Sequence, residues 1–304
     1  MWTVLALLGG LAACGSPSGG PTQPAPPIRV LAVETFLADM AQNVAGDRLQ
    51  VEALLPIGVD PHGYEPTPGD VVRVAEADMV IVNGAGFEGF IDTLLQNAGG
   101  QRLLIVASTG LTSRTPQEGE VSDPKHPQDP HFWLDPRNAV RYVENIRDGL
   151  SQADPAGAES YARNAAAYIV QIQELDGWIV GQVAQVPAGR RLLVTNHESL
   201  GYYADRYGFQ IVGAIVPSFS TEASPSAQQL AALVDRIRAS GAPAVFLETG
   251  ANPQLAEQIV QETGVRVVTG LFTHSVGAAD GPAPTYIEML RYDTRAIVGA
   301  LAQP

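Results

Sequence analysis

The 304-residue chain is poor in cysteine and in basic side chains. Its single cysteine excludes an internal disulfide framework and a zinc site built from several thiolates. Lys and Arg number 18 against 32 Asp and Glu, and the formal net charge of −14 argues against a nucleic-acid partner, which requires a basic face. With 45 % hydrophobic and 16 % charged residues, the composition is that of a globular protein with one large or two medium domains.

Apolar runs long enough to span a membrane are also absent. The N-terminal run, residues 1–13, is too short, and it ends in small residues directly before Cys14. Small residues before a cysteine resemble the lipobox of bacterial lipoproteins, although no Lys or Arg precedes Arg29 as a basic leader segment would require. We therefore expect residues 1–14 to be a lipoprotein signal peptide with Cys14 as the lipidation site. Residues 15–27, rich in Gly, Pro and Ser, are expected to be a disordered tether.

Short apolar segments alternate with helical patterns from residue 28 onward. Strands are predicted at 28–33, 51–55, 79–83 and 102–107, and again at 191–195, 209–214, 244–248 and 265–268. Helices are predicted at 34–44, 68–77, 88–97, 199–206, 226–239, 253–262 and 284–301. Strands this apolar, separated by helices, favour parallel sheets that are covered on both faces.

Two further helical segments, 137–152 and 156–186, lie between the two sets of strands. The second is Ala-rich, has no internal proline and is longer than an average helix, so we expect a stiff strut. The predicted fold is α/β, with two lobes that each have a central parallel sheet flanked by helices, joined by one long rigid helix. The predicted boundaries are 28–152 for the N-terminal lobe, 153–187 for the linking helix and 188–304 for the C-terminal lobe.

Four of the five histidines stand after a predicted strand or in a loop that leads to the next element: His62, His131, His197 and His274. Open α/β sheets bind ligands at that edge. A single histidine at such a place is more often a structural hydrogen-bonding residue. No H-E-x-x-H or zinc-finger spacing links the four, so the prediction of a metal site depends on all four taken together. Two belong to each lobe, as an interlobe metal site requires, and four imidazoles satisfy a tetrahedral zinc ion. His126, in the polar loop 112–130, is interpreted as a solvated residue.

Five segments carry a resemblance to a known family: DPHGYEPTPGD (60–70), DPHFWLDP (129–136), TNHESLGYYADRYG (195–208), FLETGANPQ (246–254) and GPAPTYIEMLRYDTRAI (281–297). From about residue 28 to the C-terminus the chain resembles the cluster A-I substrate-binding proteins, the ZnuA- and TroA-like zinc and manganese receptors of ABC importers. The resemblance implies two α/β lobes, one long connecting helix and a metal ion buried between the lobes. It also implies an extracytoplasmic, lipid-anchored protein, on the periplasmic side in a two-membrane bacterium. Its expected partners are a divalent metal ion, an ABC permease and the ATPase subunit, with the chain itself a monomer.

The same motifs imply a ligand set. His62 and His131 match the first two histidine ligands of the family. His197 matches the third position, which is histidine in zinc-type members and glutamate in typical manganese-type members, so Zn2+ is favoured over Mn2+. The fourth position, an aspartate in many members, is His274 here, and it either binds the ion or leaves that place to water. Imidazole in place of a hard carboxylate oxygen moves the preference further from manganese.

Other motif residues are expected to support the site. Glu248 and Asp280 are candidates for carboxylates that offset the ion's charge from outside the ligand set, with a capping or surface role as the alternative. Loop-ordering hydrogen bonds are expected from Glu65 and Asp135, and shielding of the site from Phe132 and Trp133, which also suit an aromatic core.

The pattern favours a binding protein over an enzyme. A catalytic zinc keeps an open coordination position beside a general base, and four protein ligands leave none. The sequence also has no G-x-S-x-G string and no phosphate-binding loop. We therefore expect a receptor that captures a divalent transition metal, Zn2+ first, and delivers it to a permease. A manganese or iron(II) receptor of the same family, a copper or nickel receptor and a surface adhesin lipoprotein remain as alternatives.

Overall fold

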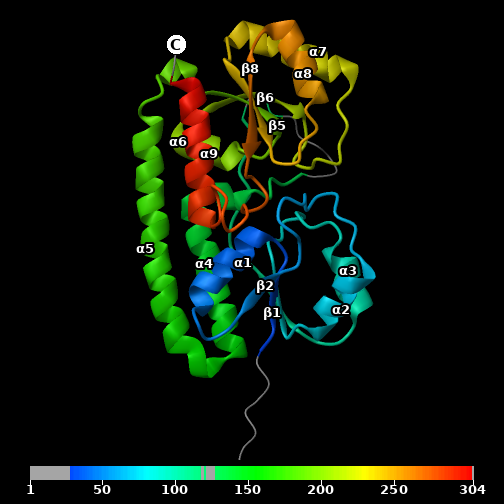
Figure 1. Cartoon of the computed structure of the whole chain (residues 1–304), viewed down its shortest axis with the longest axis vertical. Helices are drawn as coiled ribbons and strands as arrows, with labels where there is room; N and C mark the ends of the chain where they lie inside the picture. The colour runs from blue at the N-terminus through cyan, green and yellow to red at the C-terminus, as the bar shows by residue number, and fades with distance from the viewer. Residues whose placement is uncertain (1–27, 118–119, 121–126, 303–304) are drawn as a thin grey trace, which may run out of the picture.

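The computed structural model describes residues 28–117, 120 and 127–302 (Figure 1). Cys14, the expected tether 15–27 and His126 lie outside the described residues. The described part of the chain forms eight strands and nine α-helices, together with three short 3-10 helices. Each strand and helix expected from the sequence is present, with ends within three residues of those predicted.

The strands form two parallel sheets with the same topology. The first contains β1 (Val30–Ala32), β2 (Val51–Ala53), β3 (Met79–Val82) and β4 (Leu103–Val106) in the order β2-β1-β3-β4. The second contains β5 (Leu192–His197), β6 (Gln210–Val216), β7 (Ala244–Glu248) and β8 (Arg266–Leu271) in the order β6-β5-β7-β8. The predicted fold class, two α/β lobes with central parallel sheets, is confirmed.

Helices cover both faces of each sheet. The outer face of the first sheet packs against α2 (Pro68–Glu76) and α3 (Ile91–Ala98), and that of the second against α7 (Ala227–Ser240) and α8 (Gln254–Thr263) (Figure 1). The inner faces pack against α1 (Thr35–Ala45), α4 (Pro136–Ala153), α5 (Ala158–Val183), α6 (Gly201–Tyr207) and α9 (Tyr286–Leu301). These inner side chains form one hydrophobic core that continues through both lobes, so the lobes are not separately packed bodies.

The apolar character of the strands follows from this two-sided coverage. In β3, Met79 and Ile81 point into the shared core, whereas Val80 and Val82 point into the outer core beneath α2 and α3. Successive strand residues face opposite sides of a sheet, so a strand buried on both faces must be apolar at every position.

Helix α5 is the longest element, with 26 residues, or roughly 39 Å at 1.5 Å per residue. Its buried positions recur at intervals of three and four residues, which places one stripe against its neighbours: Tyr161, Ala165, Tyr168, Ile172, Leu175, Ile179 and Val183. It packs against α1 and α4 of the N-terminal lobe and α9 beside the C-terminal lobe (Figure 1). The long connecting helix expected from the sequence is therefore present. No helix among the described residues combines the length and apolarity needed to cross a membrane.

Candidate metal-binding site

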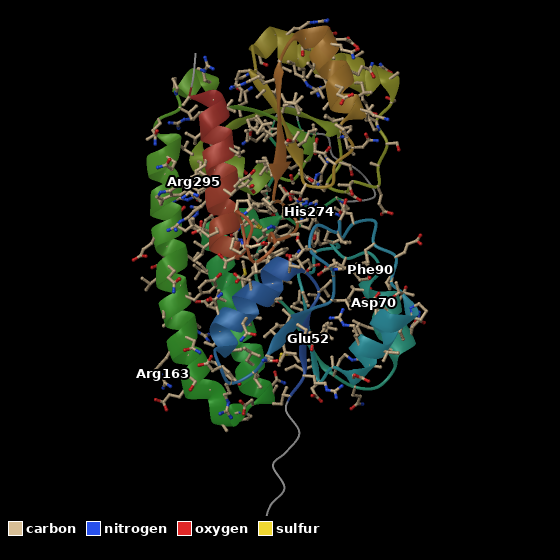
Figure 2. All side chains as sticks on the ribbon, in the orientation of Figure 1. Glu52, Asp70, Phe90, Arg163, His274 and Arg295 are labelled. Carbon is tan, nitrogen blue, oxygen red and sulfur yellow. The ribbon has the colours of Figure 1, made fainter. Side chains whose placement is uncertain are left out.

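The structure brings His62, His131, His197 and His274 together. Figure 2 shows His274 where the two lobes meet. One ring nitrogen from each lies within 4.8 Å of the others, and the ring centroids are 4.9–5.6 Å apart. His131 and His197 are fully buried, and the other two are 8 % exposed. Four side chains far apart in sequence thus form one buried cluster of nitrogen donors.

The two histidines of the N-terminal lobe are held by the same local turn. His62 lies between β2 and α2, and His131 directly precedes the short 3-10 helix η1 (Phe132–Leu134). Both stand in an Asp-Pro-His tripeptide, and in both the histidine N–H donates to the aspartate Oδ1 at 3.0 Å, from His62 to Asp60 and from His131 to Asp129. Aspartate favours such turns because its carboxylate accepts from the backbone two residues on. The repeated tripeptide is thus a sequence signal for the turn that presents each histidine.

The C-terminal lobe supplies the other two histidines from strand ends. His197 is the last residue of β5, which extends two residues past its predicted end, and it pairs with Val216 of β6. His274 follows β8 by three residues. Its neighbour Ser275 is anchored by the other lobe, because the Ser275 hydroxyl accepts from the Gly58 N–H at 2.9 Å and lies 3.0 Å from the Thr35 hydroxyl. The loop that carries His274 is therefore positioned by residues of both lobes.

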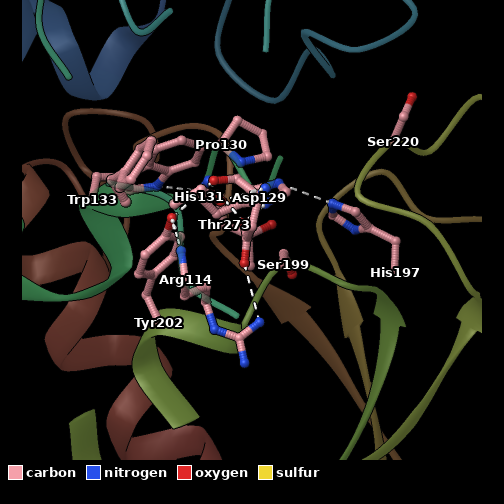
Figure 3. Close-up of polar contacts among 12 residues, drawn as sticks. Arg114, Asp129, Pro130, His131, Trp133, His197, Ser199, Tyr202, Ser220 and Thr273 are labelled. Atoms are coloured by element: carbon pink, nitrogen blue, oxygen red, sulfur yellow. Dashed lines mark hydrogen bonds and ion pairs between the residues drawn. The ribbon is translucent and has the colours of Figure 1, made fainter. Parts of the chain in front are cut away.

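The centre of the cluster has the spacing of a metal site. The Nε2 atoms of His131 and His197 are 3.2 Å apart (Figure 3). Two nitrogens bound to tetrahedral zinc at 2.0–2.1 Å stand roughly 3.3 Å apart. The Nδ1 atoms of the same rings face carboxylates, Asp129 Oδ1 at 2.9 Å and Glu248 Oε1 at 2.8 Å. Carboxylates outside the ligand set commonly fix the tautomer and orientation of ligating histidines in this way.

Glu248, one of the two expected supporting carboxylates, is the last residue of β7 and lies between two of the imidazoles. Its Oε1 also accepts from the Ser199 hydroxyl at 2.9 Å, and its Oε2 is 3.9 Å from His274 Nδ1. Burial would raise the pKa of Glu248, but the adjoining His197 and His274 outweigh it and bring the pKa to about 2. The same carboxylate raises the pKa of His197 despite its burial. Glu248 is therefore a fixed negative charge beside the cluster.

Asp129 occupies the corresponding place behind His131, but its pKa is shifted in the opposite direction. Burial raises the pKa of the Asp129 carboxyl to about 8. The hydrogen bond from the His131 N–H and the charge of the nearby Arg114 lower this pKa, but burial outweighs them. Burial, together with the other imidazoles, holds the pKa of His131 well below its ordinary value. Asp129 Oδ1 and His131 Nδ1 are hydrogen-bonded at 2.9 Å, and burial is the main cause of both pKa shifts. Arg114 lies 3.4 Å from Asp129 Oδ2, and Tyr202 donates to the Asp129 carbonyl at 2.9 Å (Figure 3).

Aromatic rings line the cluster. Phe87 lies 4.9 Å from the His62 ring and 5.6–5.7 Å from those of His131 and His274, centroid to centroid. Trp133 packs between Phe87 and Phe36 and donates from Nε1 to the Thr273 carbonyl at 2.8 Å. Trp133 and Phe87 thus shield the imidazoles.

Phe132, Asp135 and Glu65, which the sequence suggests as supporting residues, lie outside the histidine cluster in the described structure. Phe132 packs on Tyr202 in the core, and Asp135 caps α4 by accepting from the Arg137 N–H at 2.9 Å. Glu65 is exposed, and its loop is ordered by Asp70, which accepts from the Tyr64 hydroxyl at 2.7 Å and the Thr67 N–H at 2.8 Å.

Asp280 is not brought to the cluster. It is exposed and lies in a loop closed by two of its own hydrogen bonds, from the Gly277 N–H to the Ala283 carbonyl at 2.6 Å and from the Gly281 N–H to the Ala278 carbonyl at 2.8 Å. The carboxylates that approach the imidazoles come instead from Asp60, Asp129 and Glu248. Asp60 and Asp129, with Phe87 and Arg114, are the site residues that the sequence analysis missed.

Comparison with known proteins agrees with this architecture. The manganese-binding lipoprotein MntA of Halalkalibacterium halodurans is 34 % identical over 300 residues, covering 99 % of this chain and 96 % of that protein. The iron-binding protein YfeA of Yersinia pestis is 32 % identical over 303 residues, covering 100 % and 96 %. The structure of the periplasmic zinc-binding protein TroA from Treponema pallidum superposes with a TM-score of 0.83 at 28 % identity, covering 91 % of this chain and 100 % of that one. The sequence model of the periplasmic zinc-uptake complex component A family, ZnuA, matches residues 30–300, and the chain therefore belongs to this family.

Proposed function

We propose that the chain is the solute-binding component of an ABC importer that captures one Zn2+ ion between its lobes and delivers it to a membrane permease. The observation that carries this proposal is the cluster of four buried imidazoles, two from each lobe. The family consists of solute-binding receptors and not enzymes, and the metal ion is therefore cargo.

The donor set supports zinc among the divalent metals. All four donors are imidazole nitrogens, which suit zinc, whereas manganese prefers carboxylate and carbonyl oxygen. A neutral ligand set leaves the ion's +2 charge uncompensated, and the buried, ionised Glu248 lies beside the cluster to offset that charge. His274 is the position on which this argument depends most, because it replaces the aspartate that the family resemblance leads one to expect.

A manganese or iron(II) receptor is the second candidate, and the relatives favour it by name. MntA is described as manganese-binding and YfeA as iron-binding, at 34 % and 32 % identity. TroA, at 28 % identity, is described as zinc-binding. Relatives that are named for different metals match along nearly the whole chain. The donor atoms of the site are therefore a better guide to the metal than overall identity is. Copper and nickel also suit imidazole ligands in vitro.

The cellular arrangement follows from the same proposal. Relatives such as MntA are named lipoproteins, and Cys14 stands where a lipobox cysteine would be acylated. We place the protein outside the cytoplasm, anchored by lipid at Cys14, with residues 15–27 as the tether. Residues 28–152 and 188–304 form the two lobes and 153–187 the linking segment. Its partners are a permease and the ATPase subunit, and it acts as a monomer.

Isothermal titration of the metal-stripped chain with Zn2+ and then Mn2+ tests the function. The parent should bind one zinc ion tightly and manganese weakly. His274→Ala should weaken zinc binding by more than about 100-fold, because outer partners of metal ligands alone are worth 10–100-fold. His126→Ala removes the fifth histidine of the sequence, which its polar loop context marks as a solvated residue; it is the matched control and should bind zinc as the parent does.

Two outcomes would contradict the proposal. Manganese binding as tight as zinc binding would favour the second candidate. Zinc binding by His274→Ala with the parent's affinity would remove His274 from the ligand set and leave only His62, His131 and His197.

A further inference from the structure

Two cavities flank the histidine cluster, and they open on opposite members of it. The His274-side cavity, of about 390 Å³, is lined by residues that include Asp60, Asn196, Thr221, Glu248 and His274. The His62-side cavity, of about 460 Å³, is lined by residues that include His62, Ala85, Pro130 and Phe219. His131 and His197 are fully buried, so an ion reaches the cluster past His274 or past His62.

The linings of the two cavities differ in chemistry. The His274-side cavity contains two carboxylates, Asp60 and Glu248, together with amide and hydroxyl groups. The described lining of the His62-side cavity has no carboxylate and is largely apolar, with Gln128 and His62 as its polar side chains. A dication keeps its water shell until other donors replace it, so apolar walls raise the free energy of its passage. Carboxylates in a cleft lower that free energy and raise the local cation concentration.

The carboxylates of the His274-side cavity form a path from solvent to the cluster. The Asp60 side chain is 43 % exposed, and its Oδ1 lies 3.8 Å from His274 Nδ1. The Glu248 side chain is 7 % exposed, and its Oε2 lies 3.9 Å from the same nitrogen. Asp60 therefore stands at the outer end, Glu248 at the inner end, and His274 contacts both.

Asp60 also joins the lobes at this point. Its Oδ2 accepts from the hydroxyl of Thr221, which lies in the C-terminal lobe between β6 and α7, at 2.5 Å. Its Oδ1 accepts from the His62 N–H at 3.0 Å. One partly exposed carboxylate thus borders the cavity, the lobe boundary and the turn that positions His62.

We propose that the metal ion enters through the His274-side cavity and that Asp60 steers the hydrated ion at its mouth. This inference rests on the proposed function, because it concerns cargo bound at the same four histidines. A steering charge acts mainly on the association rate and on its salt dependence. Asp60 is therefore a determinant of the capture rate.

Stopped-flow mixing of the metal-free chain with Zn2+ tests the route, with tryptophan fluorescence as the signal because Trp133 lies 5.3 Å from the His131 ring. Asp60→Asn removes the charge but keeps the shape and an oxygen that accepts from the His62 N–H; its amide N–H2 then donates to the Thr221 hydroxyl in place of the present bond. The association rate should fall roughly tenfold at low salt, with a flatter dependence on ionic strength. Dissociation into excess chelator should change far less, and Asp60→Glu should restore fast association.

Two charge additions give a matched comparison that does not depend on Asp60. Asn252→Asp adds a carboxylate at the lining of the His274-side cavity, and Gln128→Glu adds one at the lining of the His62-side cavity. We expect the first to accelerate zinc association and the second to leave the rate at the parent value. Both residues are exposed, so the folds of these variants should be unaffected.

Either of two results would overturn the route: association of Asp60→Asn at the parent rate, or acceleration by Gln128→Glu. An equilibrium zinc titration of the parent separates this failure from the failure of the proposed function. A parent that binds no metal refutes the function, whereas a parent that binds zinc tightly and is unaffected by Asp60→Asn refutes only the entry route.

Discussion

His131 and His197 belong to different lobes, yet their Nε2 atoms lie 3.2 Å apart at the centre of the site. Each ring is fixed from behind by a carboxylate on Nδ1, Asp129 in one lobe and Glu248 in the other. The two halves of the site are therefore built alike, with the same ring atom turned inward and one buried carboxyl group behind it. The cluster itself is made only of imidazoles, so charge compensation for a bound cation must come from outside it, first of all from the ionised Glu248.

The first prediction concerns Glu248. Glu248→Gln keeps the side chain's size and an oxygen that accepts from Ser199, but it removes the negative charge beside His197 and His274. Zinc affinity should fall by roughly 10–100-fold, the usual effect of losing an outer partner of a metal-binding histidine. Competition with a chromophoric zinc chelator measures this change.

Asp280→Asn is the control for Glu248→Gln, because it removes the same charge from an exposed residue of the same lobe. Its zinc affinity should equal that of the parent. Equal affinities for Glu248→Gln and the parent would show that Glu248 has no part in binding.

The second prediction concerns Arg114, which is 5 % exposed and contacts three carboxylates, those of Glu120, Asp129 and Asp205. The side chains of Glu120 and Asp129 are 1 % and 0 % exposed, and removal of a buried cation leaves such partners without compensation. Arg114→Met should therefore lower the free energy of unfolding by roughly 3 kcal/mol in a denaturant titration.

Arg163→Met tests whether that effect depends on burial. Arg163 pairs with Glu159 on the outer surface of α5 (Figure 2), and the two side chains are 62 % and 90 % exposed. Exposed pairs of this kind contribute less than about 0.5 kcal/mol. Similar losses of stability for the two variants would argue against a buried network at Arg114.

Much of the fold is predictable because its causes are local. Apolar runs such as 79–83 predict strands buried on both faces, and the proline-free segment 156–186 predicts a long helix. The His62, His131 and His197 positions follow from recognisable motifs, and His274 follows from its place after β8.

The unpredicted part of the site arises from contacts between distant segments. Arg114 meets Asp205 across 91 residues, and Phe87 reaches three imidazoles from a loop without a recognisable motif. Asp280, a nearby carboxylate in the sequence, is a candidate for supporting the site, with a surface role as the alternative. The hydrogen bonds that close its loop keep it at the surface, a local geometry that the residue types alone do not specify.

The third prediction concerns Glu34, which is fully buried beside Glu88. Burial, and then the charge of Glu88 and the hydrogen bond with it, raise the pKa of Glu34 well above 4.5. Above about pH 4.5 the unfolded chain loses this proton and the folded chain keeps it, so folding binds a proton. The contribution of Glu34 to the free energy of unfolding is therefore most favourable below that pH and declines as the pH rises toward the folded-state pKa.

Glu34→Gln replaces the protonated acid by a neutral amide of the same shape. The variant should melt at a higher temperature than the parent at pH 7–8 and at the same temperature near pH 4. Glu65→Gln, at an exposed position, should match the parent at both values. A gain for Glu34→Gln that is the same at both pH values would refute a raised pKa as its cause.

The last prediction concerns metal preference and is made at His274. His274→Asp introduces an anionic oxygen donor, which suits manganese better than imidazole does. The new carboxylate would stand close to Asp60 and Glu248, which lie 3.8 Å and 3.9 Å from the present ring, and their mutual repulsion is relieved when any dication binds. The two effects add for Mn2+, whereas for Zn2+ the gain in charge is offset by the loss of a nitrogen ligand. The ratio of manganese to zinc affinity should therefore rise by on the order of tenfold or more, judging from the 10–100-fold effect of outer partners alone.

His274→Asn has the same size as His274→Asp without the charge and should lose zinc affinity with little gain in manganese affinity. Competitive titrations of both metals against one chelator measure the ratio for the parent and both variants. An unchanged ratio in His274→Asp would mean that the residue at position 274 does not set the cargo.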